Sequence, residues 1–312
     1  MRGTVGAMPQ VTSSSRPFGS LLSAMVTPFT PDGEVDLDAA VQLARRLVDA
    51  GHDGLVLNGT TGEAPTTHAP EKAELIAAVV EAVGDRAHVV AGAGSNDTLH
   101  AARMAEQAAE AGAHGLLVVS PYYSRPSQVG VVAHVRAVLD AADLPAMLYD
   151  VPGRAGVRLA DATIDTLAAD DRVVAFKDAT GDTVNAARCI ARTDLAWYCG
   201  DDALVAQLLA VGAVGIVGVV TQAASGLFRT LLDAWDRGDV AGMQRAYAAT
   251  LPVTDAVNGA GFQAVHVKAA LEVLGFVPRR TVRLPYVPAT DEEVDGIRDA
   301  LRAAGLLDAA LT

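Results

Sequence analysis

The sequence predicts an α/β protein: a (β/α)8 TIM barrel followed by a C-terminal helical domain. Three observations support this fold class. Eight short apolar segments recur along the chain, each is followed by an alanine-rich helical stretch, and no further strand pattern occurs after Gly238. Short, continuous apolar segments are typical of parallel strands that are covered on both faces. Their alternation with helices indicates a parallel sheet.

The predicted strands span residues 21–26, 54–57, 88–93, 115–119, 146–149, 173–177, 196–199 and 215–220. Eight successive strand–helix units favour a closed barrel. A doubly wound open sheet is the alternative. It is weakened because no Gly-x-Gly-x-x-Gly motif follows the first strand.

Helices are predicted between the strands, for example over residues 73–83, 99–111 and 203–211. Three further helical stretches follow near residues 239–250, 253–274 and 290–306, the last opened by a capping box at Thr290 to Glu293. An extended connection over 279–288 precedes that last helix. We therefore divide the chain into a flexible N-terminal tail (1–17), a catalytic barrel (18–237) and a C-terminal helical domain (238–312).

Composition excludes several classes of function. The formal net charge of −13 argues against binding to nucleic acid or to anionic membranes. No apolar segment reaches the roughly 18 residues that a membrane span needs, and the first 17 residues lack the apolar core of a secretory signal. Cys189 and Cys199 fit no metal or disulfide spacing, so we expect small buried hydrophobes in a cytoplasmic protein. The seven histidines are scattered, and no metal site is predicted.

Lys177 ends the sixth predicted strand and is the first candidate for catalysis. Lysines are only three of the chain's 24 Lys and Arg residues. The pattern around Lys72 predicts a surface helix, and Lys268 lies in a helical stretch, so only Lys177 follows a buried strand. Burial lowers the pKa of an ammonium group, and a neutral amine can form a Schiff base with a carbonyl substrate. The alternative is an ion pair with Asp178 at the end of the strand.

Tyr149 ends the preceding strand and is predicted to reach Lys177. Side chains alternate faces along a strand, and neighbouring strands lie about 4.8 Å apart. A phenol beside an imine-forming amine can shuttle protons. A tyrosine hydrogen-bonded at the barrel rim is the alternative reading of this residue.

Other polar groups follow the strands at the same end of the predicted barrel. The turn Gly59-Thr60-Thr61-Gly62 offers backbone N–H groups and two hydroxyls to a small anion. Asp201 and Asp202 follow the seventh strand, close to where barrels usually bind phosphate, and disfavour a phosphorylated substrate. Arg154 suits a second carboxylate, unless it is a solvated surface residue.

Four motifs occur in order at these strand ends: Gly59-Thr60-Thr61-Gly62-Glu63, Pro121-Tyr122-Tyr123-Ser124-Arg125-Pro126, Tyr149-Asp150-Val151-Pro152-Gly153-Arg154 and Lys177-Asp178-Ala179-Thr180-Gly181. Together they resemble the dihydrodipicolinate synthase (4-hydroxy-tetrahydrodipicolinate synthase) family. This family falls within the class I pyruvate aldolases that also include N-acetylneuraminate lyase. The resemblance covers residues 17–307.

The resemblance implies condensation of pyruvate with L-aspartate 4-semialdehyde on the route to lysine and diaminopimelate. It implies no cofactor other than the covalent Schiff base, and a homo-oligomer, a tetramer built as a dimer of dimers. The catalytic residues that it implies are Lys177 for the Schiff base, Tyr149 as general acid–base, and Thr60 with Tyr123 of a neighbouring subunit as a proton relay. The substrate-binding residues that it implies are Thr61 for the pyruvate carboxylate, Arg154 for the semialdehyde carboxylate, and Gly200 and Val217 beside the imine.

Two departures from the family pattern border the expected pocket. Ala64 and Gly218 each stand where the family often has serine, which leaves the second substrate open. The alternative function is a related aldolase, lyase or dehydratase acting on another 2-keto acid, of the N-acetylneuraminate lyase or 2-keto-3-deoxygluconate aldolase type. Such lyases tend not to carry an arginine at the position of Arg154. A non-enzymatic barrel would predict a degraded Lys, Tyr and Thr set, which is not seen.

The resemblance also bears on regulation by lysine. Family members that respond to lysine bind it with an acidic side chain and nearby histidines. Here His100 takes the acidic position, Ala69 and Lys72 take the two histidine positions, and Asn96 and Tyr122 match. We therefore expect that lysine does not strongly inhibit this protein.

Overall fold

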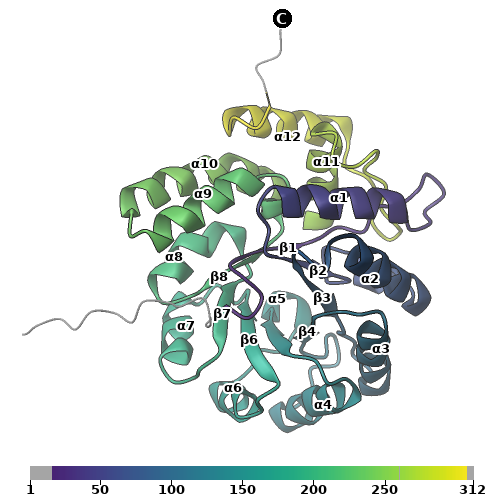
Figure 1. Ribbon diagram of the computed structural model, residues 1–312, viewed down its shortest axis with the longest axis vertical. Coiled ribbons are helices and arrows are strands. Elements are labelled where there is room, and N and C mark those ends of the chain that lie inside the picture. The colour runs from purple at the N-terminus through teal and green to yellow at the C-terminus, as the bar shows by residue number, and fades with distance from the viewer. Residues whose placement is uncertain (1–15, 260, 308–312) are drawn as a thin grey trace, which may run out of the picture.

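The computed structural model describes residues 16–259 and 261–307. Its eight parallel strands form a closed barrel in chain order, with the last strand pairing back to the first (Figure 1). The predicted barrel is therefore confirmed, and the open sheet is excluded. Of the predicted tail, residues 1–15 lie outside the described residues.

The strands are β1 (Leu21–Ala24), β2 (Gly54–Leu57), β3 (His88–Gly92), β4 (Gly115–Val119), β5 (Ala146–Asp150), β6 (Val173–Asp178), β7 (Ala196–Cys199) and β8 (Gly215–Gly218). Three of them are shorter than predicted, β3 by one residue and β1 and β8 by two. From Ala24 onward, the Gln222 side-chain amide takes the place of a neighbouring strand as hydrogen-bond partner of the backbone. It donates to the Ala24 carbonyl (2.9 Å) and accepts from Val26 N (3.0 Å). After Gly218 the chain turns, because the Asp202 carboxylate accepts hydrogen bonds from the next two backbone N–H groups.

Helices surround the barrel. They are α1 (Leu37–Asp49), α2 (Ala69–Val83), α3 (Thr98–Glu110), α4 (Gln128–Ala141), α5 (Pro152–Ala155), α6 (Asp161–Ala168), α7 (Thr183–Ile190), α8 (Val205–Ala210) and α9 (Ser225–Asp236). Short 3-10 turns follow three strands: η2 (Ala64–Thr66), η3 (Asp202–Leu204) and η4 (Val220–Gln222). No helix within residues 16–259 and 261–307 is long and apolar enough to span a membrane.

The C-terminal helical part consists of α10 (Val240–Asn258), α11 (Gln263–Val273) and α12 (Asp291–Ala303). In Figure 1 these helices gather with α9 on one side of the ring, next to α1. The predicted boundary between the stretches near 239–250 and 253–274 is wrong, because α10 continues through Pro252 to Asn258. Proline removes one backbone hydrogen bond, but Thr250, Val253 and Val257 are buried around it, and their packing maintains the helix. The predicted capping box at Thr290 is present at the start of α12.

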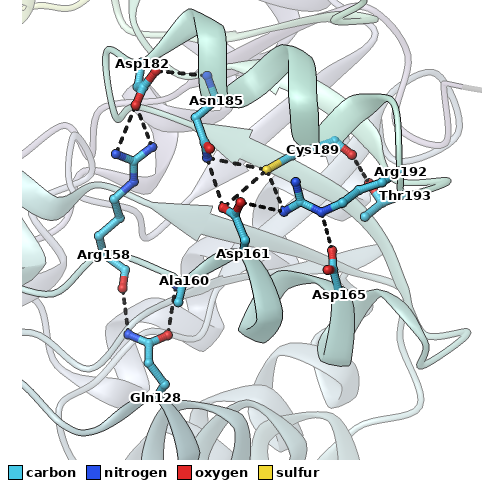
Figure 2. A network of polar contacts seen from close by, with 10 residues as sticks. All are labelled: Gln128, Arg158, Ala160, Asp161, Asp165, Asp182, Asn185, Cys189, Arg192 and Thr193. Atoms are coloured by element: carbon cyan, nitrogen blue, oxygen red, sulfur yellow. Dashed lines mark hydrogen bonds and ion pairs between the residues drawn. The ribbon is translucent and has the colours of Figure 1, made fainter.

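Both cysteines are free and buried, as predicted. Cys189 of α7 also belongs to a polar network with α6 (Figure 2). Its Sγ accepts hydrogen bonds from Arg192 (3.2 Å) and Asn185 (3.5 Å), and Arg192 also pairs with Asp165 of α6 at 2.7 Å. Burial raises the pKa of the Cys189 thiol. The residue thus joins two outer helices and does not serve only as an apolar filler.

Candidate active site

Lys177 lies near the end of β6, directly beside Tyr149 of β5. The two residues are cross-strand partners, and both are buried. Lys177 Nζ lies 4.4 Å from the centre of the Tyr149 ring. The alternation of faces along the strands thus brings the amine and the phenol together as predicted.

Asp178 does not pair with Lys177, because its carboxylate is bound elsewhere. One oxygen accepts from Trp197 Nε1 (3.0 Å), and the other accepts from the backbone N and the hydroxyl of Thr180 (2.8 and 2.7 Å). Within the described part of the chain, Lys177 Nζ has neither a hydrogen bond nor an ion pair. Burial lowers the pKa of Lys177 to about 8, although the charge of Asp202 partly opposes this shift. A usable fraction of the amine is therefore neutral near physiological pH.

Tyr149 carries the opposite shift, with the same cause. Burial raises its pKa to about 12, while the charge of Arg154 and the nearby Thr60 hydroxyl act against the rise. The phenol therefore remains protonated at neutral pH and can donate a proton beside the Lys177 amine. Thr60 belongs to the turn that follows β2, so this turn lies beside Tyr149.

That turn is closed by its own backbone. Glu63 N donates to the Thr60 carbonyl (3.0 Å), and Ala64 N donates to the Gly59 carbonyl (3.2 Å). Among the residues that the structure describes, no acceptor meets the backbone N–H groups of Thr60 and Thr61. Two free N–H groups at a turn suit a carboxylate.

A cavity of about 460 Å³ opens at this end of the barrel. Four of the eight predicted site residues form part of its wall: Thr60, Tyr123, Tyr149 and Arg154. The other four, Thr61, Lys177, Gly200 and Val217, are not in that wall as the described residues define it. A Cβ at position 200 would lie 3.0 Å from Cγ of Lys177, so glycine there makes room for the lysine side chain. Val217 is fully buried in β8.

Tyr123 and Arg154 lie at the outer rim of the cavity. The Tyr123 side chain is 88% exposed, and its backbone has a positive φ of 72°. Arg154 is also exposed, but its guanidinium is not free. It donates to Gln263 Oε1 (3.2 Å) and lies 5.4 Å from the centre of the Phe262 ring.

The C-terminal part supplies wall residues that sequence reasoning missed. Phe262 and Tyr286 stack with ring centres 4.1 Å apart, and both line the cavity. Gln263, which begins α11, binds Arg154 across 109 positions of sequence. No local motif marks these residues, since only the docking of the C-terminal part on the barrel brings them to the site.

Asp202, which was predicted only to disfavour a phosphorylated substrate, also organises the backbone after β8. Its buried carboxylate accepts from the backbone N–H groups of Val219 and Val220 at 3.1 Å. It thus occupies amide donors after β8, where many barrels hold a phosphate. A Cβ at Gly218 would lie 2.4 Å from Asp202 Oδ1, so serine would not fit at this position without rearrangement. The pair of acidic residues after the seventh strand is the sequence signal for this arrangement.

A smaller cavity of about 230 Å³ adjoins the first and shares Ala64, Pro65, Gly94 and Tyr122 with it. Lys72, His68 and His100 also line it, and none of its described lining residues is acidic. The predicted surface position of Lys72 is wrong. Its Nζ is drawn inward and donates to the carbonyls of Ala64 (3.0 Å) and Thr67 (2.6 Å), and burial lowers its pKa to about 8.

Comparison with known proteins decides the family. Residues 17–304 match the Dihydrodipicolinate synthetase family. The chain belongs to this family. A 4-hydroxy-tetrahydrodipicolinate synthase of Bifidobacterium animalis subsp. lactis is 54% identical over 93% of this chain and 95% of the relative. One from Streptomyces coelicolor is 50% identical over 96% of this chain and 99% of the relative.

A solved family structure, from Cyanidioschyzon merolae with lysine bound, has a TM-score of 0.90 and 37% identity. The match covers 93% of this chain and 99% of the Cyanidioschyzon merolae chain. These comparisons confirm the family and the synthase activity that were predicted from the sequence. They also confirm the barrel with its C-terminal helical part and the lyase class of the class I aldolase type.

Proposed function

We propose that this chain performs the family's synthase reaction through a Schiff base between Lys177 and pyruvate, with L-aspartate 4-semialdehyde as the second substrate. One observation carries the proposal: Lys177 Nζ is buried, without a partner in the described structure, and 4.4 Å from the centre of the Tyr149 ring. A neutral amine in that position can attack a carbonyl carbon.

In the proposed sequence, the Lys177 amine adds to C2 of pyruvate, and the carbonyl oxygen leaves as water after receiving protons. Tyr149 supplies a proton in this step, with Thr60 as the next member of the relay. Loss of a proton from C3 then gives an enamine, whose C3 forms a bond with the aldehyde carbon of the semialdehyde. The semialdehyde amine finally attacks C2 and releases Lys177. The imine serves as the electron sink, so this route uses no separate cofactor.

The carboxylates of pyruvate and of the semialdehyde bind at different parts of the site in this proposal. The free N–H groups of the turn at Thr60 and Thr61 suit the pyruvate carboxylate. Arg154, with its fork of donors at the rim, suits the carboxylate of the semialdehyde. Gly200 leaves space around Lys177, and Val217 contributes an apolar surface next to the imine.

We also propose that the active unit is a homo-oligomer, a tetramer as a dimer of dimers, in which Tyr123 enters the site of a neighbouring subunit. The support is its 88% exposure at the rim of the cavity. Because pyruvate and the semialdehyde are metabolites of central and amino-acid metabolism, the cytoplasm remains the expected location.

Two measurements test the reaction. Borohydride added with pyruvate should trap a mass adduct on the peptide that contains Lys177, and an adduct on Lys72 or Lys268 would contradict the assignment. A coupled assay should then show turnover of pyruvate with aspartate semialdehyde, followed through a downstream reductase. Turnover only with an aldehyde derived from a sugar acid would instead favour the related aldolase.

A further inference from the structure

Glu63 closes the catalytic turn at a point where the C-terminal part contacts the barrel. Its side chain is fully buried, and one carboxylate oxygen is bonded to Lys268 Nζ of α11. The other oxygen accepts from the backbone N of Arg283 at 3.1 Å. Both partners lie more than 200 positions further along the chain.

Lys268 is held as firmly as Glu63. It is 1% exposed, its Nζ also donates to the Thr281 carbonyl (2.8 Å), and it lies 4.1 Å from the centre of the Phe29 ring. A buried ion pair of this kind often stabilises a fold no better than well-packed apolar side chains of the same volume. Stability alone is therefore a weak explanation for this pair, and a role in fixing a conformation is the better one.

The backbone shows which conformation is fixed. Glu63 has a φ of 55°, in the left-handed region that is disfavoured for residues with a Cβ. Its N–H donates to the Thr60 carbonyl at 3.0 Å and so closes the turn. The position of the Glu63 side chain therefore controls where the Thr60 and Thr61 groups point.

We infer that Glu63 and Lys268 are positioning residues, through which the C-terminal helical part holds the Thr60–Thr61 turn in its catalytic form. The inference rests on the proposed roles of Thr60 as relay and Thr61 as carboxylate ligand. Neither Glu63 nor Lys268 needs to contact substrate. Both act through the turn, and their loss should affect pyruvate binding and proton transfer more than binding of the second substrate.

The experiment compares Lys268→Met with a matched control in the same part of the chain. Asp299→Asn breaks the exposed ion pair with Arg302 on α12 (2.9 Å). Lys268→Met should raise KM for pyruvate and lower kcat, together by about 100-fold in kcat/KM, as expected for misplaced catalytic groups. KM for the semialdehyde should change little. Asp299→Asn should leave the pyruvate KM at the wild-type value.

The double variant Glu63→Gln/Lys268→Met separates positioning from stability. It removes both buried charges, so its thermal midpoint should return toward that of the wild type, while the pyruvate defect persists. It also keeps the test valid if Lys268→Met alone does not fold. Recovery of full activity together with the midpoint would overturn the inference, as would wild-type kinetics in Lys268→Met.

Borohydride trapping distinguishes failure of this inference from failure of the proposed function. With Lys177 intact, both variants should still form the pyruvate adduct on its peptide, at a lower rate. If the wild type forms no adduct at Lys177, the proposed function fails. If the wild type forms it and the variants match the wild type in rate and KM, only the positioning role fails.

Discussion

Lys177 and Lys268 lie in two regions of the molecule that bury an amine in opposite ways. At the end of β6, Lys177 faces the Tyr149 ring and, within the described residues, no hydrogen-bond acceptor. At the contact between α11 and the barrel, Lys268 is bonded to Glu63 and to a carbonyl. Burial lowers the pKa of both groups to about 8, so the two lysines differ in their partners and not in this shift.

The contrast teaches that burial by itself does not make a lysine reactive. Lys72 is also buried, and its Nζ is held by two carbonyls. A nucleophilic amine needs a lone pair that is neither protonated nor engaged. Of the chain's three lysines, Lys177 is the one that meets this condition, and the other two serve structure.

The largest expected effect comes from Lys177→Met. Activity should fall by about 10⁴-fold or more, in the range found when a covalent nucleophile is removed, and the borohydride adduct should disappear. The thermal midpoint should stay constant or rise, because an unpaired buried amine is replaced by an apolar side chain. A midpoint that drops sharply would mean that Lys177 is also structural, and the comparison with Lys268 would fail.

Lys268→Met should show the reverse pattern. Leaving Glu63 buried without its partner should cost about 3–5 kcal/mol in the free energy of unfolding, measured by urea denaturation. The Lys177 adduct should still form in the folded fraction. A loss below about 1 kcal/mol, the level of a surface pair, would show that the pair is not closed to water.

Arg154→Ala should weaken the second substrate only. We expect a loss of about 1.5–3 kcal/mol in kcat/KM for the semialdehyde, the usual worth of a charge-assisted hydrogen bond. KM for pyruvate should stay at the wild-type value.

Gln263→Leu, which frees the Arg154 guanidinium, should also weaken the second substrate, but to a smaller extent. Arg158→Ala, in the same loop but paired with Asp182 (3.2 Å), is the control. Equal losses for both substrates would contradict the division of the two carboxylates.

The pH dependence of adduct formation should report the Lys177 amine. Its pKa is lowered to about 8, so the neutral form grows as pH rises through this value. The rate of adduct formation should therefore increase about tenfold from pH 7 to pH 9 and then level off. Stopped-flow measurement of adduct formation would show this plateau. A rate that keeps rising to pH 10 would indicate an ordinary lysine.

The smallest effect is expected from added lysine. The second cavity carries Lys72 and, among its described lining residues, no acidic group, so a cationic ligand meets the like charge of Lys72 there. A titration should show no saturable inhibition below about 1 mM, which corresponds to roughly −4 kcal/mol of binding. His100→Glu restores a carboxylate at this cavity and should make inhibition detectable. Saturable inhibition of the wild type below that concentration would show that the cavity has been misread.

The main parts of the site could be predicted because they follow from local backbone geometry. Alternation along β5 and β6 places Tyr149 and Lys177 on one face, whatever covers the barrel. The turn at Thr60 and Thr61 is likewise a local structure at the end of a strand. The ends of β1 and β8 were predicted less well, because side chains of Gln222 and Asp202 take over backbone hydrogen bonds there.

The sequence alone determined the family, the barrel, and which side chains stand at the ends of the strands, since short-range periodicity and contiguous motifs encode these features. Only the tertiary structure decided which of the three lysines is free. It also showed that Phe262, Gln263 and Tyr286 complete the site. The physical reason is that pKa, ion pairing and cavity shape depend on which groups exclude water. Glu63 and Lys268 lie 205 positions apart in the sequence, and only folding brings their side chains into contact.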